Sequence, residues 1–122
     1  TPKPSTINRK HTMSIRPVDP SFHVSGQISP AQIKDIAGLG YKTVICMRPD
    51  KEGFFQPAFS EMAEAAKDAG IEAFYIPVKP GAMTAEQAKE LKKILSSRTG
   101  PTLAYCASGN RCISAYEMTK RI

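Results

Sequence analysis

Cys106 and Arg111 are the residues of this sequence whose types and spacing point most directly to chemistry. The four residues between them are small or polar: Ala107, Ser108, Gly109 and Asn110. A cysteine that follows an apolar stretch and precedes a turn and a helix has backbone N–H groups and the positive helix end directed at its sulfur. Such surroundings lower the pKa of a thiol and make it a nucleophile at neutral pH. We therefore predict that Cys106 is catalytic, the alternative being an unreactive cysteine in a loop.

The residues after Cys106 supply groups that would bind an anion. Arg111 adds a fixed, bidentate cation beside the sulfur, and the four loop residues are expected to bind substrate. Gly109 is expected to serve the conformation of the loop. Cys112 leaves three roles open: packing in the core, stabilising the thiolate, or acting as a resolving thiol. Cys46, inside the apolar stretch 43–47, is expected to be an unreactive core residue.

Composition narrows the class of protein. The chain has 122 residues, enough for one domain, with 41% apolar and 23% charged residues, as is typical of globular proteins. Its apolar stretches are too short to span a bilayer, and its first residues do not resemble a secretory signal. Three widely spaced cysteines make no disulfide framework, so we expect a cytoplasmic protein. The formal net charge of +6 is scattered, which favours small anionic substrates over nucleic acid.

Strand and helix patterns alternate along the chain and predict the scaffold of the site. The expected strands are 22–25, 43–47, 71–78 and 102–105, and the expected helices begin at Pro30, near Phe59, after Thr84 and at Arg111. This order predicts an α/β three-layer sandwich around a short, mostly parallel sheet. Ligands bind beyond the carboxyl ends of such strands, so segments 48–57, 78–83 and 106–111 should lie together. We expect a disordered leader or linker in 1–12 and one domain in 13–122, excised from or truncated in a longer protein.

Several motifs resemble known families. The segment Tyr105 to Arg111 is similar to the active loop of bacterial rhodaneses, in which a cysteine carries a persulfide. The motifs Val24-Ser25-Gly26-Gln27, Arg48-Pro49-Asp50 and Ile76-Pro77-Val78 resemble the bacterial phosphatase-like domain of beta-lactamase hydrolase-like proteins, a family related to dual-specificity phosphatases. The resemblance implies a cysteine-phosphatase-like fold. It leaves the activity open between phosphate and sulfur chemistry.

Three departures from the phosphatase pattern lead us to predict sulfur transfer. The loop between Cys106 and Arg111 is one residue shorter than in cysteine phosphatases, and Tyr105 stands where histidine is usual. Lys79-Pro80-Gly81 occupies the place of the general-acid aspartate, whose loss typically costs ~10²–10⁴ in rate. In this reading Cys106 carries a persulfide from thiosulfate or glutathione persulfide to a thiol, sulfite or cyanide. A fused or separate persulfide-oxidising metalloenzyme is the expected partner.

Two other functions stay open at this point. The first is a cysteine-dependent phosphatase with a phosphocysteine intermediate, in which Asp50 or Glu52 is the candidate acid, although an Asp in this turn is equally well explained by local hydrogen bonding. The second is a non-catalytic anion- or thiol-sensing module. Arg48 either binds the anionic substrate at the pocket mouth or is a solvated surface residue. No nucleotide-binding motif or metal-ligand spacing is present, so we expect neither cofactor nor metal.

Overall fold

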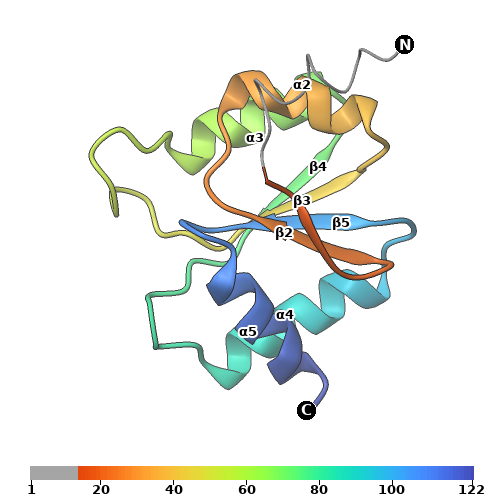
Figure 1. Cartoon of the computed structure of the whole chain (residues 1–122), viewed down its shortest axis with the longest axis vertical. Coiled ribbons are helices and arrows are strands. Elements are labelled where there is room, and N and C mark those ends of the chain that lie inside the picture. Colours follow the sequence, from red (N-terminus) through yellow and green to blue (C-terminus); the bar gives the residue numbers. More distant parts are fainter. Residues whose placement is uncertain (1–13) are drawn as a thin grey trace.

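The computed structural model describes residues 14–122, and the predicted leader in 1–12 lies outside them. These residues form a five-stranded sheet in the order β1-β2-β5-β3-β4 (Figure 1). The strands are β1 (Arg16–Asp19), β2 (Phe22–Ser25), β3 (Thr43–Cys46), β4 (Glu72–Tyr75) and β5 (Thr102–Tyr105). β1 pairs with β2 in antiparallel fashion, and the remaining pairs are parallel. The expected short, mostly parallel sheet is confirmed.

Four helices cover the two faces of the sheet. They are α2 (Pro30–Gly38), α3 (Phe59–Asp68), α4 (Ala85–Ser96) and α5 (Asn110–Thr119). α2 and α3 lie on one face and α4 and α5 on the other, which is the predicted three-layer sandwich (Figure 1). Within residues 14–122, no helix combines the length and apolar character that a membrane crossing requires.

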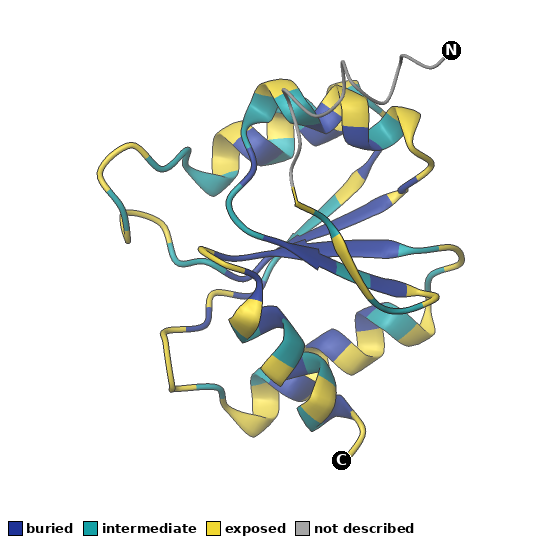
Figure 2. Cartoon of the chain, viewed as in Figure 1, coloured by how far each residue is buried: buried dark blue, intermediate teal, exposed yellow. Residues whose placement is uncertain are grey.

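The alternation of side chains along β5 decides which face the candidate nucleophile occupies. Leu103 and Tyr105 pack in the core formed with α2 and α3, whereas Ala104 and Cys106 pack in the core formed with α4 and α5. All four side chains are buried, as is most of the central sheet (Figure 2). Cys106 therefore faces the first turn of α5, while Tyr105, which stands in the place of the usual histidine, lies on the opposite face.

The ends of several elements differ from the sequence-based expectation. β1 was not expected, because Arg16-Pro17-Val18-Asp19 combines proline with charged residues, a composition that only an edge strand tolerates. β4 ends at Tyr75 rather than at residue 78, although the backbone N–H groups of Ile76 and Val78 still donate to the carbonyls of Cys46 and Met47. The last helix begins at Asn110 and ends at Thr119. The capping box of Thr84 and Gln87 is present as predicted.

Candidate active site

Cys106 lies at the carboxyl end of the central strand β5 and is completely buried. Its backbone N–H donates to the Ser25 carbonyl of β2 at 3.3 Å. The backbone N–H of Gly109 donates to the Cys106 Sγ at 3.0 Å. The loop thus folds back over its own first residue and directs an amide at the sulfur.

The Cys106 thiol is strongly acidified. A hydrogen bond from the Cys112 thiol, supported by the backbone N–H groups of Ser108, Cys112 and Gly109, outweighs burial and lowers the pKa of Cys106 to about 5. Burial and the same hydrogen bond raise the pKa of Cys112, so Cys112 keeps its proton and donates it to the sulfur. At neutral pH Cys106 is therefore a thiolate, and Cys112 stabilises it as well as packing in the core.

Two glycines let the loop lie close against β2. Gly109 is the N-cap of α5 and has a φ of 93°, a left-handed conformation that favours glycine. A Cβ at this position would lie 3.3 Å from the Ser25 carbonyl oxygen and would overlap the guanidinium of Arg16. A Cβ on Gly26 would lie 2.9 Å from the Ala107 carbonyl oxygen. The end of β2 and the side chain of Arg16 therefore form the wall behind the loop.

Arg111 is held on one edge and open on the other. Its Nη1 donates to Glu52 Oε2 at 2.8 Å and to the Val78 carbonyl at 2.8 Å, and its Nη2 donates to Glu52 Oε1 at 2.7 Å. A guanidinium carries five N–H donors, so within residues 14–122 these contacts leave Nε–H and the second Nη2–H, which share the other edge, without a partner. Two parallel donors on one edge match two oxygens of a tetrahedral anion.

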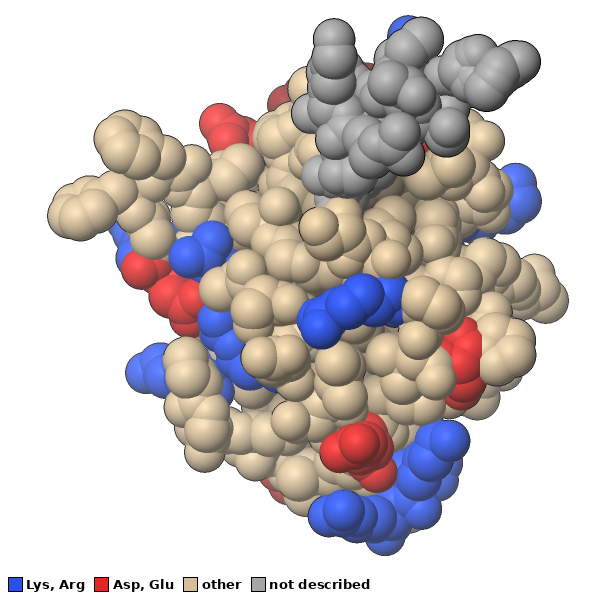
Figure 3. Space-filling view, viewed as in Figure 1, with Lys and Arg blue, Asp and Glu red and all other residues tan. Residues whose placement is uncertain are grey.

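Glu52 links this arginine to a second one. Arg48 Nε donates to Glu52 Oε1 at 2.9 Å, and Arg48 Nη1 donates to Gln27 Oε1 at 3.0 Å. The hydrogen bond from Arg111, with that from Arg48, lowers the pKa of Glu52, so its carboxylate stays charged at neutral pH. Figure 3 shows positively and negatively charged side chains next to one another at the left edge of the molecule.

The predicted meeting of three segments is confirmed by these contacts. Arg111 contacts Glu52 of segment 48–57 and Val78 of segment 78–83. The carboxyl ends of β3 and β5 lie on the same side of the sheet, on the left of Figure 1. Sequence reasoning missed Glu52 as a partner of Arg111. The available signal was its spacing of four residues from Arg48, which is common for ion pairs but also ordinary on any surface.

Asp50 is tied to the start of α3. Its Oδ1 accepts from the Phe59 backbone N–H at 2.8 Å, and its own backbone N–H donates to the Tyr75 hydroxyl at 2.9 Å. The carboxylate thus satisfies an N–H of the first helical turn. A direct chemical role for Asp50 stays a prediction.

The remaining predicted residues lie around the mouth of the loop. Ala107, Ser108 and Asn110 are exposed, and the Ser108 carbonyl accepts from Arg16 Nη2 at 2.8 Å. Their binding role, like that of Arg48, stays a prediction. Cys46 is buried on the other face of the sheet, and burial raises the pKa of its thiol, in agreement with an unreactive core residue.

Segment 48–57 projects from the body on the left of Figure 1 and exposes two aromatic rings. The side chains of Phe54 and Phe55 are fully exposed. The loop beneath them is fastened by Gln56, which accepts from the Gly53 N–H at 3.0 Å and donates to the Pro49 carbonyl at 2.8 Å.

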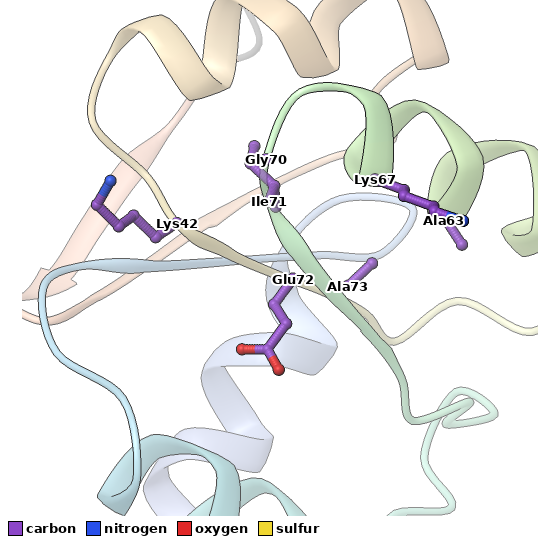
Figure 4. A pocket seen from close by; sticks show the side chains of 7 residues that line it. All are labelled: Lys42, Ala63, Lys67, Gly70, Ile71, Glu72 and Ala73. Carbon is purple, nitrogen blue, oxygen red and sulfur yellow. The ribbon is translucent and has the colours of Figure 1, made fainter.

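A surface hollow of about 550 Å³ lies at the opposite end of the sheet. Its lining consists of Lys42, Ala63, Lys67, Gly70, Ile71, Glu72 and Ala73. Figure 4 shows the side chains of Lys42, Lys67 and Glu72 pointing in different directions. Glu72 is engaged by Arg98 at 2.9 Å. Because its polar groups do not converge and it holds no nucleophile, this hollow is a poorer candidate site than the Cys106 loop.

Comparison with known proteins identifies what this arrangement is similar to. Residues 14–122 match the family described as beta-lactamase hydrolase-like protein, phosphatase-like domain. A beta-lactamase hydrolase-like protein of Xylella fastidiosa is 27% identical over 110 residues, which are 90% of this chain and 26% of that protein. The chain therefore spans about a quarter of this curated relative.

Solved structures agree with the family match. The crystal structure of a candidate phosphatase from Neisseria meningitidis has 31% identity and a TM-score of 0.80, covering 89% of this chain and 78% of that chain. TpbA from P. aeruginosa, solved in complex with pTyr, has 16% identity and a TM-score of 0.58, covering 90% of this chain and 59% of that one. The second likeness shows the fold alone, and together with the first it confirms the cysteine-phosphatase-like architecture.

The prediction of a rhodanese-type sulfurtransferase is wrong. The family and the relative from Neisseria are described as phosphatase-like, and the comparisons give no support for sulfur transfer. The physical reason lies in the loop: with only four residues between Cys106 and Arg111, its amides still converge on the sulfur, and the arginine still offers a free edge to an anion. Loop length therefore does not separate the two chemistries. The expected persulfide-oxidising partner has no support from these comparisons.

Proposed function

Because the chain belongs to the phosphatase-like domain family of beta-lactamase hydrolase-like proteins, we propose that it is a cysteine-dependent phosphatase acting on phosphate monoesters. One observation carries the proposal. The acidified sulfur of Cys106 lies within a loop whose amides point at it, beside an arginine that is fixed by Glu52 and Val78 but keeps one donor edge open.

Cys106 is the nucleophile of the first step. Its thiolate attacks phosphorus, an S–P bond forms, and the P–O bond to the leaving group breaks, with the electron pair going to the leaving oxygen. In the second step a water oxygen attacks the phosphocysteine, and the S–P bond breaks to release inorganic phosphate and the thiolate. The low pKa of Cys106 serves both steps, because a stable thiolate is also a good leaving group.

The loop amides and Arg111 would bind the phosphoryl oxygens. Backbone N–H groups that are already oriented require no rearrangement when charge develops on the transferring group. The open edge formed by Nε–H and Nη2–H of Arg111 would bind two of these oxygens in parallel. Glu52 fixes the direction of that edge, and Arg48 adds positive charge at the mouth.

The leaving oxygen needs a proton, and the local carboxyls restrict where it comes from. Glu52 remains ionised because its ion pairs lower its pKa, so it is a poor acid. Asp50 is the other carboxyl of segment 48–57, and one of its oxygens is already bound to the Phe59 amide. We infer a preference for aryl phosphates, whose phenolate leaving groups depend least on protonation.

Turnover of an aryl phosphate tests the proposal. The wild-type protein should hydrolyse p-nitrophenyl phosphate, and Cys106→Ser should lose the activity while remaining folded. Rapid acid quenching of the wild type should trap one phosphoryl group on the peptide that contains Cys106. No hydrolysis and no trapped group, with Cys106 still alkylated as a thiolate, would contradict the proposal and favour the non-catalytic anion- or thiol-sensing module.

The wider setting of the activity is part of the same proposal. Three free cysteines and a nucleophilic thiolate suit a reducing compartment, so we expect a cytoplasmic location. The substrate is expected to be a phosphate ester rather than a nucleic acid.

A further inference from the structure

Arg16 reaches the candidate catalytic loop from the edge of the sheet. It lies on β1, where it is paired with Val24 of β2. Its Nη2 donates to the Ser108 carbonyl at 2.8 Å, across 92 positions of sequence. Ser108 is two residues beyond the nucleophile, so a residue far away in the sequence is bonded directly to the loop.

The bonded carbonyl belongs to the same peptide unit as the amide that faces the sulfur. No peptide in the described residues is cis, and in a trans peptide the C=O and the N–H point in opposite directions. The Ser108 carbonyl points to Arg16, and the Gly109 N–H points to the Cys106 Sγ at 3.0 Å. A flip of this unit would turn the carbonyl oxygen toward the thiolate and replace an attraction by a repulsion.

Glycine makes this peptide unit easy to flip. Gly109 has a φ of 93°, and a residue without a Cβ passes readily between positive and negative φ. The loop's own sequence therefore holds the orientation weakly. The Arg16 guanidinium lies where a Cβ of residue 109 would be, so it also fills the space beside the glycine.

We propose that Arg16 is a positioning residue for the nucleophile: by holding the Ser108 carbonyl outward, it keeps the Gly109 N–H on the sulfur of Cys106. This role rests on the proposed function in that Cys106 is the nucleophile. The other titratable or charged groups that act on this sulfur are Cys112 and Arg111 from α5 and, through charge alone from the opposite face of the sheet, Cys46 of β3. All three are unchanged by a substitution at residue 16, so a change in the acidity of Cys106 reports on the loop peptide and on the charge of Arg16.

The test measures the acidity of Cys106 without requiring turnover. The full chain is alkylated with iodoacetamide at a series of pH values, and the modified peptide is quantified by mass spectrometry. Arg16→Met keeps an apolar side chain in place but cannot donate, and Arg16→Lys keeps a charged donor. Arg98→Met is the matched control, since Arg98 pairs with Glu72 at the opposite end of the sheet.

The wild-type profile should have its midpoint near pH 5. Arg16→Met should move the midpoint up by about one pH unit. At pH values well below the midpoint, the fraction of Cys106 that is thiolate should then be about tenfold lower than in the wild type. Arg16→Lys should have a midpoint close to that of the wild type, because it keeps a charged donor. Arg98→Met should match the wild type. The kcat for p-nitrophenyl phosphate at pH 5 should fall in parallel.

An unchanged midpoint in folded Arg16→Met would overturn the proposal. Should Arg16→Met not fold, Arg16→Gln, which is too short to reach Ser108, takes its place under the same criterion. A protein that turns over no phosphate ester but shows the shift would refute the proposed function and leave the role of Arg16 standing. The two failures are therefore distinguishable.

Discussion

Glu52 and Arg111 form a two-point ion pair across 59 positions of sequence, with contacts of 2.8 and 2.7 Å. The pair decides what the arginine can do. It occupies the Nη1 and Nη2 end of the guanidinium and leaves the Nε and Nη2 edge to other partners, so the carboxylate fixes the cation rather than covering it. Sharing Glu52 with Arg48 keeps that carboxylate ionised.

Glu52→Gln tests this orientation. The amide keeps the size of the side chain but loses the charge that holds both arginines, so Arg111 should explore other positions. We expect kcat/KM for p-nitrophenyl phosphate to fall by about 10-fold to 100-fold, the range associated with misplacing a binding group by about 1 Å. Stability should change by less than ~1 kcal/mol, because partly exposed ion pairs contribute little.

Glu61→Gln, on the exposed side of α3, is the control for removing a negative charge. It should leave kcat/KM unchanged. Equal activity of Glu52→Gln and Glu61→Gln would show that Arg111 needs no orienting carboxylate.

Cys112 gives a prediction about pH. The wild-type thiolate exists above about pH 5, so activity should be lost as the pH falls through that value. Cys112→Ala removes the largest contribution to the low pKa of Cys106, and the acid limb of kcat/KM should move to higher pH. Cys112→Ser keeps a donor and should stay close to the wild type. The acid limb is measured from about pH 4 to about pH 8, and coincident limbs for Cys112→Ala and the wild type would contradict the role of this hydrogen bond.

Substitutions of Gly109 and Gly100 by alanine distinguish the effect of backbone strain from the effect of steric crowding. Both have positive φ, 93° and 78°, but only Gly109 has neighbours within reach of an added Cβ. Gly100→Ala should cost about 1 kcal/mol of unfolding free energy and leave activity intact. Gly109→Ala should cost more and abolish most activity, because its methyl group displaces Arg16 and presses on Ser25. Chemical denaturation measures the loss of stability, and kcat measures the loss of activity. Equal results for the two variants would contradict steric crowding between a methyl group at residue 109 and its neighbours.

Asp50 can be an acid, a helix cap, or both. Asp50→Asn retains an oxygen that accepts from the Phe59 amide but cannot give up a proton at neutral pH. If Asp50 is only a cap, this variant keeps its stability and its activity on alkyl and aryl phosphates. If it is the acid, kcat should fall by ~10²-fold for an alkyl ester and much less for p-nitrophenyl phosphate. Asp50→Ala should lose about 1 kcal/mol of stability in either case.

Local sequence signals predicted the elements that carry the nucleophile. The apolar stretch 102–105, the turn residues after Cys106 and the helix beyond them define β5, the loop and α5 almost to the residue. Their success has a physical cause: turn residues and buried strands act through short-range sterics and burial, which a sequence shows directly. The same holds for α2 and α4, whose first turns follow Ser29 and Thr84.

The contacts that tune the site were not predictable in the same way. Two hydrogen bonds, from Arg16 to Ser108 and from Arg111 to Glu52, join residues that only the order of the strands brings together. The sequence around an arginine or a glutamate does not show whether its side chain will meet such a distant partner. The choice of sulfur over phosphorus failed for a related reason. It rested on the short loop between Cys106 and Arg111, on Tyr105 in place of histidine and on the missing aspartate at 79–81. None of these shows the directions of the N–H groups, which decide what the loop can hold.

The position of Arg16 on β1 ties the reactivity of the sulfur to an edge of the sheet. Among residues 14–122, β1 and β4 each have a neighbouring strand on one side only, and such edges open locally at lower free energy than central strands. Hydrogen exchange should therefore be fast in β1 and slow in β5. Warming should release the Ser108 carbonyl and raise the pKa of Cys106 before the chain unfolds as a whole, because the nucleophile follows the central strand whereas Arg16 lies on an edge strand.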